Sequence, residues 1–430
     1  MVVLVWMSED IDMLNRYESY MAPRVAHFFR EVGLGTQSCP EFVPESFSSY
    51  CQDDDDYWSA GFLLRVAMRM HHLWPTYGVR DGKRTIQGEQ PAVCFARFSL
   101  ADLIAVRDGF TTQNGAVTQY AITFPMDVAL EGGIQSVIRW TGGQARLQDG
   151  TLIDGLARED ADNQFRYIDD DPNTPHQASA CSEWRWRCPG NYRRQIKKIE
   201  ANGYDGNVIP GLELTQEKWA GMGIVVPDLP TARLLQYDIL CLIDQGIIYE
   251  THVDYLLVCD QLPASLEGLG EEELQAAFSK ACVDFKSCMN VASGEADAAD
   301  LDLMDRVLEL ENSTAKQAVQ ERGGCWLWFQ DNTHPYVRAL IKAGRVKPNL
   351  NGRYLAWLND LDHARDLRER QAVVLALSEQ LRESYGIQST YFSVLNSRSP
   401  DGAPAYAGNI WGGGYFITLQ PDEEDEGEGS

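Results

Sequence analysis

The stretch Ser182-Glu-Trp-Arg-Trp-Arg187 alternates charged and aromatic side chains. A β-strand repeats every two residues, so the charged side chains share one face and the two tryptophans share the other. The pattern predicts a half-buried strand whose tryptophans anchor the core. Its charged face is either simply solvated or carries a functional carboxylate with guanidinium groups, and the strand by itself leaves both interpretations open.

A cluster of basic residues begins in this strand and continues after it, on a chain whose net charge is −26. Its members are Arg185, Arg187, Arg193, Arg194, Lys197 and Lys198, with Tyr192 among them. The net charge argues against a protein that simply coats nucleic acid, but basic residues interleaved with aromatic ones are typical of local polyanion sites. A short solvated helix after Pro189-Gly190 would explain the same residues, so both interpretations stay open.

A glycine-punctuated loop from Tyr77 to Pro91 leads into the apolar run Ala92-Val-Cys-Phe95. Its basic residues are Arg80, Lys83 and Arg84. Guanidinium groups match the oxygens of a pyrophosphate, which makes the loop a candidate for nucleotide binding. The loop is neither a P-loop nor a dinucleotide fingerprint, because it lacks Gly-Lys-Ser/Thr and Gly-x-Gly-x-x-Gly. An ordinary basic turn is the alternative.

The rest of the chain alternates short strands and helices, so the predicted fold class is α+β. Helices are predicted over 8–33 (divided near Pro23), 59–73, 100–107, 234–246 and 360–385, and over much of the acidic segment 263–322. Strands are predicted over 92–95, 120–124, 136–140, 181–187, 224–227, 325–329 and 391–395. The polar segment 154–177 is predicted to be a long loop.

Composition and motifs exclude several classes of protein. A chain of 430 residues with 44% hydrophobic residues can bury a large core. No stretch is long enough and apolar enough to span a membrane, and a signal peptide is lacking, so we expect a cytoplasmic protein with no membrane partner and with its ten cysteines reduced. Neither a Cys-x-x-Cys pair nor a His-Glu-x-x-His motif occurs, so no metal is expected.

Four phrases, in this order and spacing, resemble a known family. They are Gln90-Pro-Ala-Val-Cys-Phe95, Tyr120-Ala-Ile-Thr-Phe124, Gly132-Gly-Ile-Gln-Ser-Val-Ile138 and Ser182-Glu-Trp-Arg185. Over roughly residues 70–250 the chain resembles the DarT-like and abortive-infection ADP-ribosyltransferases of bacteria. The stretches Gly352-Arg-Tyr-Leu355 and Tyr391-Phe-Ser-Val394 look like an uncharacterised domain of similar bacterial proteins and add no function.

The resemblance implies a mixed β core with helices, and it divides the chain into five expected parts. These are a helical N-terminal segment (1–75), an ADP-ribosyltransferase-like domain (76–262), an acidic helical connector (263–320), a smaller α/β C-terminal domain (321–420) and a disordered acidic tail (421–430).

The resemblance also implies that NAD is a co-substrate and that Glu183 is the catalytic residue, on a strand near the ribose. The NAD contacts that it implies are Arg80, Arg84, Thr85, Gln90, Phe95, Arg97 and Tyr120. The residues expected to bind the acceptor are Arg185, Arg187, Arg193 and Arg194. In the family, an early strand carries a His/Arg-x-Thr motif that holds nicotinamide. That strand is not found in the sequence, and Arg84-Thr85 is the candidate for holding nicotinamide in its place. Phe95 or Tyr120 would stack on nicotinamide, although aromatic residues on strands commonly belong to the core.

The basic cluster beside Glu183 favours nucleic acid as the acceptor. The resemblance implies a toxin or phage-defence effector that is controlled by an antitoxin or a phage trigger. NAD hydrolysis and protein ADP-ribosylation are alternative activities. A non-catalytic interaction protein of a defence system, which uses the tryptophan-rich strands and the charged helix 360–385, is the alternative from a different class.

Overall fold

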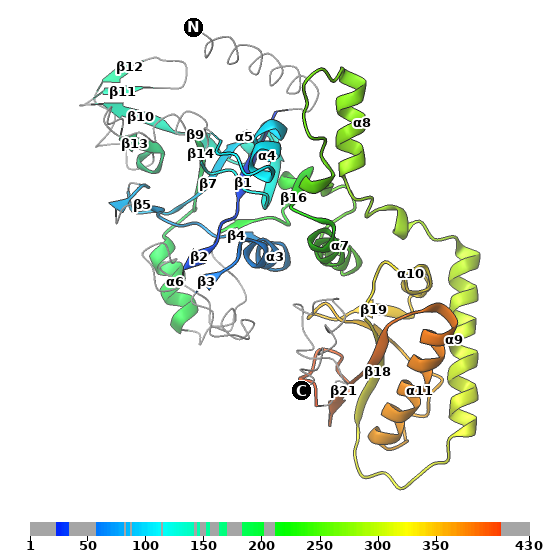
Figure 1. The fold of residues 1–430 in the computed structure, drawn as a ribbon. Helices are drawn as coiled ribbons and strands as arrows, with labels where there is room; N and C mark the ends of the chain where they lie inside the picture. Colours follow the sequence, from blue (N-terminus) through cyan, green and yellow to red (C-terminus); the bar gives the residue numbers. More distant parts are fainter. Residues whose placement is uncertain are drawn as a thin grey trace, which may run out of the picture. The chain divides into compact units, whose positions relative to one another are not determined.

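The computed structural model describes residues 23–33, 57–80, 83–86, 88–112, 115–141, 144–146, 152–154, 163–169, 183–201 and 211–405 (Figure 1). These residues form two compact units. The first unit holds the described residues up to Arg233 and those from Tyr249 to Asp284, and the second holds Leu234–Ile248 and the described residues from Phe285 onward. Both units combine helices with β-sheet, which confirms the α+β class. Within the described ranges, no helix has both the length and the apolar character that crossing a bilayer requires.

A seven-stranded sheet is the centre of the first unit. Its strands, in spatial order, are β17 (Val253–Val258), β16 (Met222–Val226), β8 (Ala121–Pro125), β1 (Arg24–Phe28), β7 (Ala92–Arg97), β14 (Glu183–Arg187) and β9 (Gln135–Ser136). Neighbouring strands are antiparallel except β16 and β17, which are parallel. The sheet therefore brings β14 next to β7, and β7 next to a strand from the start of the chain.

The strand β1 corrects the predicted helix over 8–33. Val25 and Ala26 are fully buried, and β1 pairs with β7 on one side and with β8 on the other. A central strand that is covered on both faces lacks the alternation of polar and apolar residues that identifies an edge strand. The predicted helical residues before Pro23 lie outside the described residues.

One face of the sheet is covered by α4 (Leu100–Arg107) and α8 (Glu271–Ala281). Ala26, Ala121 and Val225 of the sheet share a hydrophobic cluster with Leu103 of α4. We call this face the α4 face. On the opposite face, the ring of Phe124 packs against that of Trp219, with 5.1 Å between their centroids.

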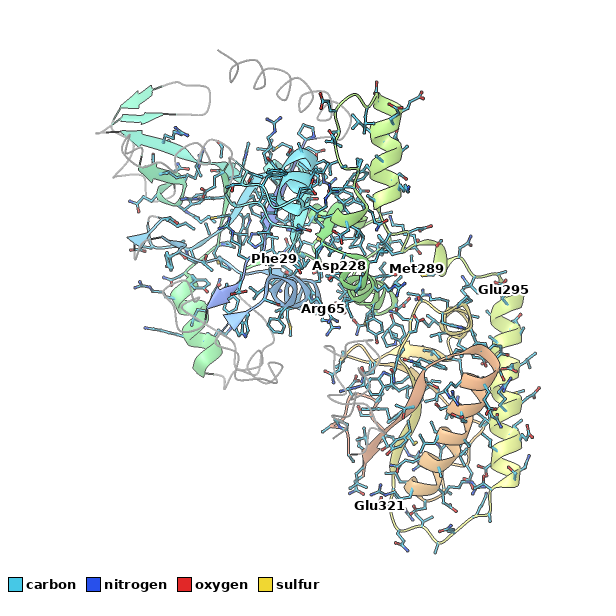
Figure 2. The ribbon with its side chains drawn as sticks, in the orientation of Figure 1. Phe29, Arg65, Asp228, Met289, Glu295 and Glu321 are labelled. Carbon is cyan, nitrogen blue, oxygen red and sulfur yellow. The ribbon has the colours of Figure 1, made fainter. Side chains whose placement is uncertain are left out.

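The other helices of the first unit are α3 (Ala60–Met70), α5 (Met126–Glu131), α6 (Tyr192–Ala201) and the start of α7 (Leu229–Asp244). The predicted helix over 100–107 is confirmed, and the helix predicted over 59–73 is confirmed up to Met70, after which His72–Leu73 form β4. The side chains of Ser59 and Ser99 cap their N-termini. Asp228, labelled in Figure 2, caps α7 by accepting from the Thr231 amide at 2.8 Å.

Several small sheets surround the central one. They are β2 (Val32–Gly33) with β3 (Tyr57–Trp58), β4 (His72–Leu73) with β15 (Leu212–Glu213), β5 (Val79–Arg80) with β6 (Lys83–Arg84), and the set β10 (Ile138–Thr141), β11 (Gln144–Arg146), β12 (Leu152–Asp154) and β13 (Tyr167–Asp169). The predicted strand over 136–140 is divided at Val137 between β9, which pairs with β14, and β10, which belongs to a different sheet.

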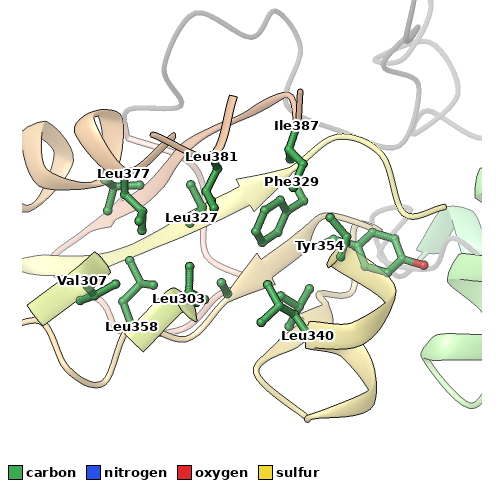
Figure 3. Packing of buried hydrophobic residues seen from close by; sticks show 14 of the residues in the cluster. Leu303, Val307, Leu327, Phe329, Leu340, Tyr354, Leu358, Leu377, Leu381 and Ile387 are labelled. Carbon is green, nitrogen blue, oxygen red and sulfur yellow. The ribbon is translucent and has the colours of Figure 1, made fainter. Parts of the chain in front are cut away.

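The second unit is a four-stranded antiparallel sheet with helices on one face. Its strands, in spatial order, are β19 (Val346–Pro348), β20 (Tyr354–Ala356), β18 (Gly323–Phe329) and β21 (Ser389–Leu395). Its helices are α9 (Ser293–Ser313), α10 (Pro335–Lys342) and α11 (Leu367–Tyr385). Figure 3 shows the core, where Leu327 and Phe329 of β18 face Leu303 of α9 and Leu377 of α11. Trp326 and Trp328 point to the other face of the sheet.

Two boundaries in this unit differ from the predicted ones. The helix predicted from 360 begins at Leu367, because the Asp366 carboxylate accepts from backbone amides and caps it there; it ends, as predicted, at Gly386 (φ 71°). The segment expected to connect two domains contains α9, which begins near Glu295 (Figure 2) and is part of the second unit's core.

Candidate functional site

Glu183 lies at the start of β14, and its side chain is 28% exposed. Its Oε1 accepts a hydrogen bond from Nε of Arg185 at 2.7 Å. Arg185 is buried, and a second nitrogen of its guanidinium donates to the carbonyl of Phe165 at 2.6 Å. The guanidinium is therefore anchored at both ends, and it holds a partly exposed carboxylate in a fixed position.

The position of Arg185 changes the role expected for it. We predicted that Arg185 binds an acceptor, but its side chain is only 2% exposed and both of its described contacts are internal. A buried guanidinium has no contact with solvent through which to reach a macromolecule, so Arg185 is a positioning residue for Glu183. Arg187 lies at the other end of the strand and is half-buried.

The Glu183–Arg185 pair lies on the α4 face of the sheet. Glu183 is directly opposite Ala96, and Ala96 is directly opposite Ala26, whose side chain packs in the α4 cluster. Directly opposed residues of antiparallel strands point to the same face. Cys94, opposite Arg185, is on this face too, and burial, followed by the negative charge of Glu183, raises the pKa of its thiol to about 12. A thiol with that pKa stays protonated at neutral pH and is a poor nucleophile.

Phe95 and Tyr120 do not meet Glu183 among the described residues. Phe95 is opposite Trp184, so it points to the other face of the sheet, where its buried ring contacts the rings of His27 and Phe124. The Tyr120 ring lies against Gly61 at the start of α3. Phe95 is therefore a core residue, and no described contact brings either ring beside the carboxylate.

The remaining predicted NAD contacts are dispersed. Arg80 and Arg84 belong to the β5–β6 hairpin, outside the seven-stranded sheet, and Thr85 follows that hairpin with its amide bonded to the Gly78 carbonyl at 2.9 Å. Arg84-Thr85 is thus not on an early strand of the sheet. Arg97 is exposed at the end of β7.

Gln90 has a structural contact that the sequence did not suggest. Its Oε1 accepts from the backbone amide of Tyr192 at 3.0 Å, at the first residue of α6. The side chain therefore satisfies one of the free amides at this helix N-terminus and connects the loop before β7 to the basic helix.

His27 is a candidate that sequence reasoning missed. It lies on β1, next to β7, and its Nδ1 is 2.9 Å from the carbonyl oxygen of Cys94. A carbonyl only accepts, so Nδ1 carries the proton. Burial lowers the pKa of His27, which keeps the ring neutral and leaves Nε2 as an acceptor. The resemblance implies a His/Arg-x-Thr motif on an early strand; His27 lies on the early strand β1, but Phe29, two residues later, is not a threonine and follows the end of β1.

The helix α6 presents a basic face to solvent. The Asn191 side chain accepts from the Arg194 amide at 2.9 Å and caps the helix, and Tyr192 is buried beneath it. The exposed cations are Arg193, Arg194, Lys197 and Lys198. Their spacing places them on one side of the helix, and no carboxylate of the described chain pairs with any of them. A solvated basic helix therefore follows Pro189-Gly190, as expected from the alternative to a polyanion site.

The site has no cluster of metal ligands in the part of the chain that the structure describes: no group of three or more His, Cys, Asp or Glu side chains there could hold an ion. What the site offers is a fixed, accessible carboxylate at one end of β14 and an accessible row of cations beyond the other end.

Comparison with known proteins gives one match, and it lies in the second unit. Residues 292–417 match the family described as "Protein of unknown function (DUF4427)". The match begins at the residue before α9 and so includes the helix that we expected to be a connector. No curated protein and no solved structure matches the chain.

Proposed function

We propose that the protein is an NAD-dependent ADP-ribosyltransferase that modifies nucleic acid. The observation that carries the proposal is the Glu183 carboxylate, which is partly exposed, begins a sheet strand and is fixed by the buried Arg185 at 2.7 Å. A carboxylate held in this way is preorganised to stabilise positive charge that develops next to it.

The chemistry requires such a group. The bond between C1′ of the ribose and the nicotinamide nitrogen breaks, and the pyridinium leaves as neutral nicotinamide while the ribose gains oxocarbenium character. Glu183 would stabilise that cation and hydrogen-bond a ribose hydroxyl, as carboxylates do in glycoside hydrolysis. A base nitrogen of the acceptor then bonds to C1′, and its proton passes to Glu183.

The position of α6 supports a polymeric acceptor. Glu183 and Arg187 are at opposite ends of β14, about 13 Å apart at the rise of a strand, and α6 begins beyond Arg187. The distance from the Glu183 carboxylate to Arg193 is therefore longer than one base. An acceptor that contacts both groups must be longer than a single nucleotide base. A single strand of nucleic acid is long enough, with its phosphates on the cations and one base at Glu183.

His27 does not lie at the site that carries the proposal. Its ring and the Glu183 carboxylate belong to neighbouring positions of the same sheet but to opposite faces, since His27 contacts Phe95 and Glu183 is on the α4 face. His27 is on an early strand that Arg84-Thr85 does not occupy, but its side chain is on the face away from Glu183, so we do not include it among the NAD contacts. Control by an antitoxin or a phage trigger, which the resemblance implies, is part of the same proposal.

The test is transfer of label from NAD to separate pools of single-stranded DNA, RNA and protein. Glu183→Gln is the diagnostic variant, because its amide oxygen still accepts from Arg185. Glu131→Gln, at an exposed carboxylate of α5, is the matched control. We expect label in one nucleic-acid pool with the wild type and the control, and none with Glu183→Gln.

Other outcomes of this experiment would replace the proposal. Label in the protein pool alone would make the enzyme a protein ADP-ribosyltransferase. Nicotinamide release without label transfer would make it an NAD glycohydrolase. Absence of both reactions, together with absence of NAD binding, would leave a non-catalytic interaction protein.

A further inference from the structure

The second unit contains a cavity of about 880 Å³ that belongs to no site described above. Side chains of Glu311, Arg322, Asp360, Asp362, His363 and Arg398 line it. They come from the end of α9, the residue before β18, the loop before α11 and the turn after β21. The cavity has the size of sites that bind small molecules.

The carboxylates of the cavity are neutralised by cations of the same unit. Oε2 of Glu311 accepts from Nε of Arg365 at 2.7 Å, and Arg365 is almost fully buried. Asp362 pairs with Lys316 at 2.5 Å. Asp360 pairs with Arg345 at 3.2 Å. Arg345 also pairs with Asp300 at 2.5 Å, and Arg365 lies 3.9 Å from Glu369, so two of these cations are shared with other carboxylates. Each acid of the cavity still has a cationic partner, which reduces the negative charge that it contributes.

Two of the three arginines that line the cavity differ from the acids in this respect. Arg322 and Arg398 are exposed, and no carboxylate in the described part of the chain pairs with either. The Asn396 amide donates to the Arg322 carbonyl at 2.8 Å, which joins the two segments and brings Arg398 to the same end of the cavity. The pKa of Arg370 behind them is lowered, first by burial and then by the positive charge of Arg398. This end of the cavity is therefore positively charged.

We infer that this cavity binds a small phosphate-bearing molecule, whose phosphate is held by the guanidinium groups of Arg322 and Arg398. Arginine pairs with phosphate through two parallel N–H···O bonds, and two unpaired arginines at one end of a cavity suit a pyrophosphate or a phosphomonoester. The ring of His363 is the one ring among the residues that line the cavity. Recognition therefore depends on phosphate rather than on stacking of a base.

The experiment is calorimetry of the full-length protein with inorganic pyrophosphate, ADP and citrate as separate probes. We expect pyrophosphate and ADP to bind, and citrate to bind about tenfold more weakly or not at all. Arg322→Gln with Arg398→Gln should weaken pyrophosphate binding by about tenfold or more, as expected when charge-assisted hydrogen bonds are removed.

Arg233→Gln with Lys280→Gln is the matched control, because it removes two exposed cations of the first unit that belong to no proposed site. This control should bind pyrophosphate as the wild type does. Equal binding by wild type and the Arg322/Arg398 variant would overturn the inference, as would absence of binding by the wild type or tighter binding of citrate than of pyrophosphate. Circular dichroism of both variants, together with the single substitutions, separates loss of the site from loss of the fold.

Discussion

At the scale of single residues, Arg185 decides how the candidate site is built. Its guanidinium is buried between the Glu183 carboxylate and the Phe165 carbonyl. Removing the carboxylate leaves a buried cation without its counter-charge, which is costly, and the cost is greater when a hydrogen-bond acceptor is lost as well. The stability of the first unit and the position of Glu183 therefore depend on the same pair.

This pair predicts that two substitutions at Glu183 differ in stability. Glu183→Ala leaves the Arg185 guanidinium without its partner and should lower the free energy of unfolding by about 3 kcal/mol. Glu183→Gln also removes the counter-charge but keeps an acceptor oxygen, so it should cost about 1 kcal/mol less than Glu183→Ala. Urea denaturation followed by circular dichroism measures both values. Equal losses for the two variants would show that the guanidinium is not held by this contact.

His71 predicts how the stability of the first unit depends on pH. It ends α3 in the left-handed conformation, and burial, followed by the charge of His72, lowers its pKa from 6.5 to about 4. The unfolded chain therefore binds more protons than the folded one between these values. Stability from this residue is complete above pH 6.5 and is lost as the pH falls towards 4.

His71→Asn tests this dependence, because asparagine tolerates the left-handed conformation and does not titrate. We expect the urea midpoint to fall less between pH 7 and pH 5 in this variant than in the wild type. The control is His363→Asn, which replaces an exposed histidine. Its urea midpoint should fall as much as that of the wild type. If the urea midpoint of His71→Asn falls as much as that of the wild type, the pH dependence comes from other groups.

At the scale of elements, α6 should supply most of the affinity for nucleic acid. Replacing Arg193, Arg194, Lys197 and Lys198 with glutamine removes the basic face. For a single-stranded oligonucleotide, the slope of log K against log[salt] should fall by about 0.7 for each phosphate that the helix no longer neutralises. Fluorescence anisotropy at several salt concentrations measures affinity and slope together.

The matched control for α6 replaces the same number of exposed cations elsewhere: Arg233, Lys280, Lys342 and Lys347. Both variants change the net charge equally, so they differ only in where the charge is removed. If the control reduces affinity and slope as much as the α6 variant does, binding depends on net charge and the helix is not a docking surface.

Many elements could be predicted from local sequence. The strands around Ala92-Val-Cys-Phe95 and Glu183-Trp-Arg-Trp-Arg187 and the helix Leu100–Arg107 are confirmed, because alternation, serine caps and flanking glycines act within a few residues. β1 could not be predicted, because its place between β7 and β8 depends on pairing with strands about 70 and 95 residues away. His27 was missed with it.

The candidate site was predicted only in part. Glu183 and α6 were singled out correctly as accessible charged groups, since their patterns are local. The burial of Arg185 was not predicted, because the Phe165 carbonyl comes from a distant segment of the chain. The strand period placed Arg185 on the same face as Glu183, but it could not show what covers that face.

At the scale of the whole molecule, the second unit depends on residues from well before its matched family region. Asp244, at the end of α7, forms two hydrogen bonds with Arg338 at 2.6 and 3.0 Å, and both side chains are buried. The Tyr354 hydroxyl also donates to Asp244 at 2.7 Å. This network makes Leu234–Ile248 part of the second unit, and the predicted boundaries at 262 and 320 do not coincide with the observed division.

Asp244→Ala should therefore destabilise the second unit selectively. It leaves Arg338 as an uncompensated buried charge, which costs about 3–5 kcal/mol. Tyr354→Phe removes two hydrogen bonds, one donated to Asp244 and one accepted from Asn332, and should cost about 2 kcal/mol. Hydrogen exchange should accelerate in peptides from β18 and α11 and stay unchanged in β7. Equal acceleration in β7 would contradict the division into two units.

The central claim is that Glu183 is the catalytic carboxylate of an NAD-consuming enzyme. The most direct measurement is the rate of nicotinamide release from NAD by the wild type, Glu183→Gln and Glu131→Gln, with single-stranded nucleic acid present. We predict release by the wild type and by Glu131→Gln, and a rate at least about a hundredfold lower for folded Glu183→Gln, as expected when a carboxylate that stabilises the transition state is removed. Release by Glu183→Gln at the wild-type rate, or no release by any of the three proteins, would contradict the claim.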